Sequence, residues 1–275
     1  MSSLRILFLG DVVGEPGRKA VIGQLARFRE EEAVDFIIVN GENSAGGRGI
    51  TPRITIDLLR AGAAVVTTGD HVWDQQELID YFPTEPRLLR PLNYPPGTPG
   101  AGSVVLETAK GKVGVIQVQG RSFIQPPLEN PFLAAEAEAE RLRAEGVKVI
   151  VCEIHAETTS EKIAMGRLLD GKVSFVVGTH THVQTADERI FPGGTGYLTD
   201  AGMCGPEDSV LGRSVESVVW RFKTGLPTRF PVAKGPVRLC GAIFDVDPAT
   251  GACLSVRRVS HLLEDEPAPA PSQSA

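Results

Sequence analysis

Short apolar runs recur along the chain, and each is followed by glycine and polar residues. Residues 4–9 read LRILFL, and similar runs occupy residues 34–39, 63–68, 147–152 and 173–177. Continuous apolar runs of this length are typical of parallel strands that are buried on both faces. The pattern therefore predicts a sheet of parallel strands whose carboxyl ends carry polar residues.

Helix signals lie between several of these runs, so strands and helices alternate as they do in α/β proteins. Thr51 and Pro52 are one such signal, because threonine is a favourable N-cap and proline fits the first helical position. Ser160 is expected to cap a later helix. The predicted helices span residues 16–29, 52–60, 132–145 and 160–169.

Two hairpins are predicted, with strands at 103–107 and 112–119 and at 237–246 and 253–259. Residues 189–212 are glycine-rich and are expected to form a loop beside the site.

The composition fits one domain with a sizeable core. The chain has 275 residues, of which 42% are hydrophobic, and we expect a single domain over residues 1–263. Residues 264–275 are acidic and then rich in Pro, Ala and Ser, which predicts a disordered tail. No run approaches the roughly 20 apolar residues of a membrane span, and no signal-peptide pattern precedes the first strand. A cytoplasmic protein is therefore expected.

Cysteine usage and charge argue against several classes of protein. The four cysteines are widely scattered and form no CxxC pair, so neither a disulfide framework nor a zinc ribbon is indicated. The formal charge of −6 argues against a protein that coats duplex nucleic acid. It leaves open a small anionic substrate, because bound metal ions add local positive charge. Charge alone does not decide whether RNA is a substrate.

The histidines are concentrated where strands are predicted to end. The chain has only five, and His71 and His155 each follow an apolar run. His180 and His182 follow a third run within the stretch GTHTH, and His261 lies near the tail. Two imidazoles one residue apart at a strand end suit a metal ion. A lone histidine in such a place is more often structural, but four together predict a metal site.

Acidic and amide side chains follow the first three apolar runs. Asp11 follows the first, Glu42 and Asn43 lie in a glycine-rich loop after the second, and Asp70 precedes His71 after the third. Ligands of open α/β sheets bind at this carboxyl edge. Asp11 alone would equally suit a turn cap, and the loop lacks the G-x-G-x-x-G spacing of a dinucleotide site. Taken together, these oxygen donors favour an ion or phosphate site.

The order of these residues resembles that of the calcineurin-like metallophosphoesterases. Asp11, Gly69-x-His71, His155 and Gly178-x-His180-x-His182 occur in the order typical of that family. Longer segments are similar to its bacterial YmdB-type subfamily, which is implicated in the hydrolysis of cyclic nucleotides. These segments are GDVVGEPGR, NGENSAGGRGIT, HAETTSEK, GTHTHVQTAD and YLTDAGMCGP. The similarity extends over nearly the whole chain.

The resemblance implies an α/β fold of the αββα type, in which two packed β-sheets are flanked by helices and two metal ions lie where strands end. It implies that Asp11 and His182 hold the first ion and that Glu42 bridges the two. The second ion would be held by Asp70, His155 and His180. His71 would face the phosphate and protonate the leaving oxygen as the general acid.

Two positions depart from the family pattern. The wider superfamily has Asp-x-His at its first motif, whereas this chain has Asp11-Val12-Val13, so one ligand of the first ion is missing. Asn43 is the expected substitute. Asp70 stands where the family has asparagine, and this change adds a negative charge beside the second ion.

The resemblance therefore predicts a dinuclear-metal phosphodiesterase for small phosphodiesters, with 2′,3′-cyclic nucleotides as the expected substrates. A hydroxide that bridges the ions would attack phosphorus, because two cations about 3.5–4 Å apart lower the pKa of a bound water toward roughly 7. Carboxylate, amide and imidazole ligands suit iron or manganese, as divalent or mixed-valence ions. The four cysteines are not needed for this site.

Two other functions are consistent with the same residues. One is a regulatory protein that binds metal and a phosphate ligand but turns over slowly, and rapid metal-dependent turnover that disappears in His71→Ala would exclude it. The other is a metallo-amidohydrolase, because clustered histidine and aspartate also occur on other α/β scaffolds. Activity on amides but not on phosphodiesters would select it. A homo-oligomer is expected only because symmetric association is common.

Overall fold

Two β-sheets form the centre of the protein. The structure is a computed structural model that describes residues 3–264. The first sheet has the strand order β2-β11-β12-β1-β3-β4, and β13 pairs with β12. Its strands are β1 (Leu4–Leu9), β2 (Asp11–Val12), β3 (Phe36–Asn40), β4 (Val65–Thr67), β11 (Met203–Pro206), β12 (Val237–Val246) and β13 (Cys253–Leu263). Strands β1, β3 and β4 are parallel, as their continuous apolar character predicts.

The second sheet has the strand order β5-β6-β7-β8-β10-β9. Its strands are β5 (Ser103–Thr108), β6 (Gly111–Gln119), β7 (Val149–His155), β8 (Phe175–Thr179), β9 (Arg189–Ile190) and β10 (Gly196–Leu198). Strands β6, β7, β8 and β10 run parallel, and β5 and β9 are antiparallel edge strands. Both predicted hairpins, β5 with β6 and β12 with β13, are confirmed.

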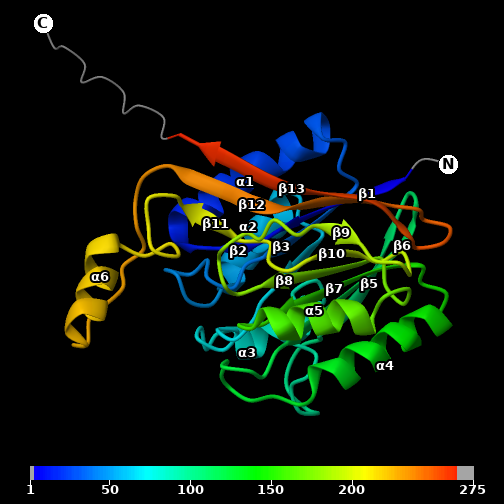
Figure 1. Cartoon of the computed structure of the whole chain (residues 1–275), viewed down its shortest axis with the longest axis horizontal. Coiled ribbons are helices and arrows are strands. Elements are labelled where there is room, and N and C mark those ends of the chain that lie inside the picture. The colour runs from blue at the N-terminus through cyan, green and yellow to red at the C-terminus, as the bar shows by residue number, and fades with distance from the viewer. Residues whose placement is uncertain (1–2, 265–275) are drawn as a thin grey trace, which may run out of the picture.

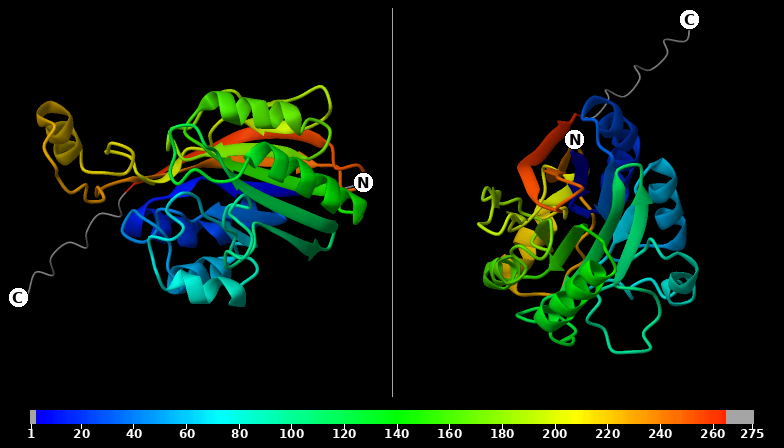
Figure 2. Two further views of the ribbon diagram at one scale, coloured as in Figure 1. Left: turned by 90° about the horizontal axis from the view of Figure 1, so that it is seen from below. Right: turned by 90° about the vertical axis from the view of Figure 1, so that its right-hand side faces the viewer.

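The sheets pack face to face, and helices cover their outer faces (Figures 1 and 2). Apolar side chains from both sheets form one core, in which Phe175 of β8 stacks on Phe244 of β12 with ring centroids 4.0 Å apart. Helices α1 (Gly14–Glu31) and α2 (Pro52–Ala61) pack on the first sheet, and α4 (Pro131–Ala144) and α5 (Thr159–Leu168) pack on the second. The short helices α3 (Leu78–Tyr81) and η1 (Phe82–Thr84) lie in the connection after β4. The αββα sandwich is confirmed.

One helix stands apart from this sandwich. Helix α6 (Val215–Thr224) belongs to the excursion between β11 and β12, and it projects away from the sheets at the left of Figure 1. The view from below in Figure 2 shows the same separation. Only Val218 of this helix is buried. The sequence patterns above did not predict it. We refer to residues 207–236, which include α6, as the arm.

Three sequence predictions were wrong in detail. The strand predicted at 147–152 extends to His155, because Glu153 is a buried strand residue that accepts hydrogen bonds from Asn40 and Thr179. The N-cap of α5 is Thr158 rather than Ser160, since the Thr158 side chain accepts a hydrogen bond from the Glu161 amide. The predicted loop at 189–212 contains β9, β10 and β11, which are short strands.

The N-cap predicted at Thr51 is confirmed, because its hydroxyl accepts a hydrogen bond from the Ile54 amide at 3.2 Å. No helix among residues 3–264 has both the length and the apolar character needed to cross a membrane. The predicted tail lies, apart from Glu264, outside the described residues.

Candidate metal centre

The candidate ligands come from the carboxyl ends of strands in both sheets. Asp11 lies in β2, Glu42 and Asn43 follow β3, and Asp70 follows β4. From the second sheet, His155 is the last residue of β7, and His180 and His182 follow β8. The sandwich therefore places two sets of strand ends opposite each other. This edge of the two sheets is the floor of a cavity, and we call it the floor below.

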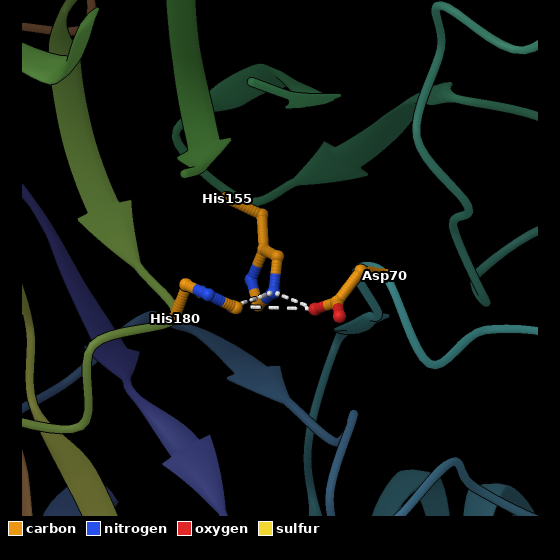
Figure 3. Close-up of side chains that lie close together, drawn as sticks. All are labelled: Asp70, His155 and His180. Carbon is orange, nitrogen blue, oxygen red and sulfur yellow. Dashed lines mark hydrogen bonds and ion pairs between the residues drawn. The ribbon is translucent and has the colours of Figure 1, made fainter. Parts of the chain in front are cut away.

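Asp70, His155 and His180 form one tight group on the floor (Figure 3). The Oδ1 atom of Asp70 lies 3.0 Å from Nε2 of His155 and 3.2 Å from Nδ1 of His180. The two imidazoles are 3.1 Å apart at these nitrogens. Three donor atoms that converge in this way match the set expected to hold the second metal ion.

His155 also joins a second group with Asp11 and Glu42. Its Nε2 lies 2.7 Å from Oε2 of Glu42, and its Nδ1 lies 3.8 Å from Oδ1 of Asp11. All three side chains are at most 1% exposed. Glu42, Asp70 and His71 form a third group, so Glu42 lies between the other ligands as a bridging carboxylate would.

His182 and Asn43 lie against each other. Nε2 of His182 is 3.1 Å from Oδ1 of Asn43, while its Nδ1 faces the carbonyl oxygen of Leu211 at 3.1 Å. The structure thus pairs His182 with the amide that was expected to replace the missing first ligand. It does not bring His182 into one of the three groups described above.

Several ionisable side chains of the floor are buried, and a bound cation would balance their negative charge. Burial raises the pKa of Glu42 to about 8, although His155 opposes the shift. Burial alone would lower the pKa of His155, but the charge of Glu42 and the hydrogen bond to Asp70 outweigh it, so the pKa is raised well above the usual value. Among residues 3–264, no group hydrogen-bonds to Oδ1 of Asp11, which is fully buried.

These observations fit metal binding. A buried carboxylate oxygen without a partner is costly unless a cation or proton satisfies it. Carboxylate and imidazole donors that converge on one point are the ligands that divalent first-row metals prefer. The protein chain alone must hold a proton among these groups, and a divalent cation can take its place.

The loop that carries His180 and His182 has an unusual backbone. Both histidines have positive φ, 95° and 64°, which is uncommon for residues other than glycine and costs on the order of 1–3 kcal/mol each. Asp11 and Asp200 hold the loop in this form. Asp11 accepts a hydrogen bond from the His180 amide at 3.1 Å, and Asp200 accepts from the amide and hydroxyl of Thr181 at 3.2 and 2.7 Å.

Asp200 is itself held by a buried lysine. Lys162, on α5, donates to Oδ2 of Asp200 at 2.6 Å, and the two side chains are 0% and 1% exposed. The Gly202 amide donates to the other carboxylate oxygen at 2.8 Å. A buried ion pair with this many hydrogen bonds gives the loop a fixed position relative to α5.

His71 is positioned by neighbours on both sides. Its amide donates to Oε1 of Glu42 at 2.6 Å, and its Nδ1 lies 3.1 Å from Oδ2 of Asp74. Arg48 donates to the same oxygen of Asp74 at 2.8 Å. Burial lowers the pKa of His71, while the carboxylates of Asp70 and Asp74 oppose this shift. His71 lines the cavity, and its Nε2 lies 3.8 Å from Oδ2 of Asp70.

Sequence reasoning missed three residues that support the site. Glu157 lies 3.1 Å from Nε2 of His180, Asp74 contacts His71, and Asp200 holds the His180 loop. The spacing of Asp74 three residues after His71 was an available signal, because a turn brings such positions together. Glu157 and Asp200 carried no comparable signal, since their contacts join segments that are distant in sequence.

The floor lies at one end of a cavity of about 410 Å³. Glu42, Asp70, His71 and His180 are among the residues that line the polar end. Apolar residues of the arm, which are Val210, Leu211, Val218, Phe222 and Phe230, also line the cavity, and we call this part of the lining its apolar end. Glu157 and Arg213 also line the cavity. A ligand with one anionic end and one apolar end would fit this division.

Comparisons with known proteins agree with this geometry. Residues 7–259 match the family described as YmdB-like protein. A Bacillus subtilis (strain 168) protein named 2′,3′-cyclic-nucleotide 2′-phosphodiesterase is 46% identical over 266 residues, which cover 96% of this chain and 98% of that protein. A Mycoplasma pneumoniae protein named as a putative phosphatase/phosphodiesterase is 36% identical over 97% of this chain and 96% of its own.

Solved structures give the same fold. A hypothetical protein from Thermus thermophilus has a TM-score of 0.87 at 40% identity and covers 96% of this chain and 100% of its own. A structure described as a novel phosphatase from Mycoplasma pneumoniae has a TM-score of 0.89 at 34% identity over 96% and 95% of the two chains. A 5′-nucleotidase precursor, also from Thermus thermophilus, shares the fold, with a TM-score of 0.59 at 17% identity over 95% of this chain and 55% of its own.

Proposed function

Because the chain belongs to the YmdB-like family, we propose that it is a metal-dependent phosphodiesterase that hydrolyses 2′,3′-cyclic nucleotides. The observation that carries the proposal is the convergence of Asp70, His155 and His180 with Asp11 and Glu42 on the cavity floor. The name of the Bacillus subtilis relative, with which the chain aligns over nearly its whole length, supports the choice of substrate.

Two metal ions are part of the proposal. Asp70, His155 and His180 would hold one, Asp11, Asn43 and His182 would hold the other, and Glu42 would contact both. When bound, the ions would lower the pKa of a coordinated water and stabilise negative charge on phosphate oxygens. The absence of cysteine from the clusters of described residues favours iron or manganese over a thiolate zinc site. Metal analysis of the purified protein tests this assignment.

His71 supplies the proton for the leaving group. Hydrolysis adds the oxygen of water to phosphorus and breaks the P–O2′ bond, and the O2′ atom must take up a proton. His71 lines the cavity, and its Nδ1 lies 3.1 Å from Oδ2 of Asp74, whose negative charge opposes the lowering of the His71 pKa by burial. His71 is therefore the general acid, and Asp74 is its positioning residue. The product is a nucleoside 3′-phosphate.

Hydrolysis of 2′,3′-cyclic AMP by metal-stripped protein tests the proposal, with Mn²⁺ restored and a chelator as control. We expect turnover only with metal. His71→Ala should lower kcat by about 10²–10⁴-fold, the usual contribution of general acid catalysis. The loss should be much smaller for bis(p-nitrophenyl) phosphate, because p-nitrophenolate leaves readily without a proton.

His261→Ala is the matched control. His261 packs edge-on against Phe28 on the outer side of the first sheet, with ring centroids 5.5 Å apart, and its removal should leave both activities unchanged. Protein that binds metal but hydrolyses neither diester would contradict the proposal. An equal loss on both substrates in His71→Ala would contradict the role of His71 as general acid while leaving the phosphodiesterase activity in place.

Two further expectations belong to this proposal. A cytoplasmic location is expected of an enzyme that acts on small intracellular nucleotides, and cell fractionation would test it. Homo-oligomerisation is a prediction from the general frequency of symmetric assemblies, and light scattering would test it. The proposal assigns no RNA substrate: the formal charge of −6 gives RNA binding no support, because polymer binding depends on neutralising many phosphates, and an assay with RNA would test it.

A further inference from the structure

We propose that the apolar end of the cavity, formed by the arm, is a binding subsite for the nucleobase of the substrate, with Phe222 and Phe230 as its specificity-determining residues. The inference rests on the proposed function, because it assumes that a cyclic phosphodiester occupies the floor. It goes further by assigning the base to residues of the arm.

The first support is the continuity of the cavity. Phe222 and Phe230 line the same space as Asp70, His71 and His180, so one ligand can contact both ends. A volume of about 410 Å³ lies in the range of small-molecule sites. The phosphodiester alone requires only the polar end. An apolar wall beside a phosphate site therefore indicates a substrate that carries a flat, weakly polar group.

The second support is the exposure of the two aromatic rings. Phe222 is 83% exposed and Phe230 is 41% exposed. A single exposed apolar side chain needs no explanation, but these two rings line one cavity together with Val210, Leu211 and Val218, and such a grouped apolar surface is typical of a binding site. A nucleobase suits this surface, because its faces are apolar and stack on aromatic rings regardless of which base is present.

The third support is the way the arm is attached to the floor. The amide of Ser214, the N-cap of α6, donates to the carbonyl of Pro231 at 3.0 Å, and Arg213 pairs with Val232 in a β-bridge. The Arg213 guanidinium donates to the carbonyl oxygens of Gly46 and Phe230 at 3.4 and 3.1 Å. It also donates to Gly47.

Gly46 and Gly47 belong to the loop that begins with Glu42 and Asn43. Arg213 therefore links the base of the arm directly to the loop that carries Glu42 and Asn43. The five N–H donors of its guanidinium suit such multiple contacts. The contacts of Arg213 thus fix the distance between the apolar end and the polar end of the cavity. A fixed spacing is what a substrate of defined length, such as a cyclic nucleotide, requires.

Another exposed aromatic residue of α6, Trp220, provides an internal control. Trp220, which is 43% exposed, lies on the same helix as Phe222 but is absent from the cavity lining. The proposal therefore predicts different roles for two exposed aromatic residues that are two positions apart in one helix.

The test compares two cyclic diesters on the Mn²⁺-loaded full chain. One is 2′,3′-cyclic AMP, and the other is methyl ribofuranoside 2,3-cyclic phosphate, which keeps the ribose and the cyclic diester but lacks the base. The wild type should prefer the nucleotide in kcat/KM. Phe222→Ala and Phe230→Ala should each reduce this preference about tenfold, mostly through KM, as expected for the loss of one stacking ring. The base-free ester should be hydrolysed as before.

Two further variants sharpen the result. Phe222→Tyr should keep the preference, because the ring is retained, and Trp220→Ala should behave as wild type. Equal kcat/KM for the two diesters in the wild type would overturn the inference. So would a Phe222→Ala variant that keeps the preference and changes only the molar mass in solution, which would assign this ring to contact between copies of the chain. Failure of the wild type to hydrolyse either diester would instead refute the proposed function.

Discussion

The two ends of the cavity are built in opposite ways. The floor is made of strand ends from two packed sheets, and its candidate metal ligands Asp11, Glu42 and His155 are at most 1% exposed. The apolar end, which we call the wall, is made by the arm, whose helix α6 projects from the sandwich, and Phe222 on this helix is 83% exposed. Both ends face the same cavity. The charged side chains therefore lie in the buried, tightly packed part of the molecule. The apolar side chains of the cavity lie in the more exposed part.

This difference has a physical basis. Converging carboxylates repel one another and carry a desolvation cost, so they need a scaffold whose own stability exceeds that cost. A surface that only covers an apolar group needs no such support, because the hydrophobic effect is non-directional. We therefore expect substitutions that disturb the floor to affect stability and metal binding strongly. Substitutions of the exposed residues of the arm should leave the stability of the sandwich almost unchanged.

The largest effect is expected at the buried pair beneath the His180 loop. Asp200→Ala leaves Lys162 as a buried charge without its carboxylate, and it removes the acceptor of the Thr181 amide. Losing one partner of a buried ion pair typically costs about 3–5 kcal/mol. Urea unfolding of the metal-free protein should show a decrease of this size in the free energy of unfolding.

A double variant separates the two contributions. Asp200→Ala combined with Lys162→Met removes both charges, so it should recover part of the stability, and the remaining deficit reports the lost support of the His180 loop. Asp208→Asn is the control, because Asp208 is exposed and its change should stay within about 0.5 kcal/mol. A single variant Asp200→Ala that lost less than about 1 kcal/mol would show that the floor does not depend on this pair.

A smaller effect is expected at the rim of the floor. Glu157 lies 3.1 Å from Nε2 of His180, whose Nδ1 faces Asp70. A carboxylate on the outer nitrogen of a ligating histidine orients the ring and makes it a better donor, and its removal typically costs 10–100-fold in metal affinity. Because the Glu157 side chain is 49% exposed, we expect Glu157→Gln to weaken metal affinity about tenfold, which is the lower limit of this range.

Isothermal titration calorimetry with the metal ion measures this affinity. Glu30→Gln, at an exposed position of α1, is the control for loss of one negative charge. An equal weakening in both variants would show that Glu157 acts through net charge rather than through its contact with His180.

Much of the floor could be predicted from sequence because its signals are local. Each ligand follows an apolar run, and a parallel sheet brings the carboxyl ends of such runs to one edge. His155 shows where local reasoning failed. The strand before it was expected to end at Cys152, where the apolar run meets Glu153. The tertiary partners of that carboxylate, Asn40 and Thr179, allow it to be buried within the strand.

The helix of the arm carried a periodic signal that the sequence analysis did not use. Val215, Val218, Val219 and Phe222 recur at i, i+3, i+4 and i+7 and form an apolar stripe on one face of α6. The position of the helix relative to the sandwich carried no such signal. That position depends on contacts at the base of the helix, such as the amide of Ser214 with the carbonyl of Pro231. Both the supports of the floor and the position of the wall thus depend on pairings between distant segments, for which periodicity gives no signal.

The smallest effect is expected on the exposed face of the arm itself. Trp220→Ala and Phe222→Ala remove large side chains that are 43% and 83% exposed, and exposed substitutions usually change the free energy of unfolding by no more than about 0.5 kcal/mol. For contrast, Phe175→Ala removes a ring that is fully buried in the stack between the sheets and should cost about 3–5 kcal/mol.

Urea unfolding at two protein concentrations measures all three variants. If Trp220→Ala or Phe222→Ala lost more than about 1 kcal/mol, and if the loss grew with protein concentration, the rings would be buried against another copy of the chain. A loss that did not depend on concentration would place them in contact with the sandwich. Unchanged stability, together with a lost preference for the nucleotide only in Phe222→Ala, would show that the wall acts on the substrate and contributes nothing to the fold.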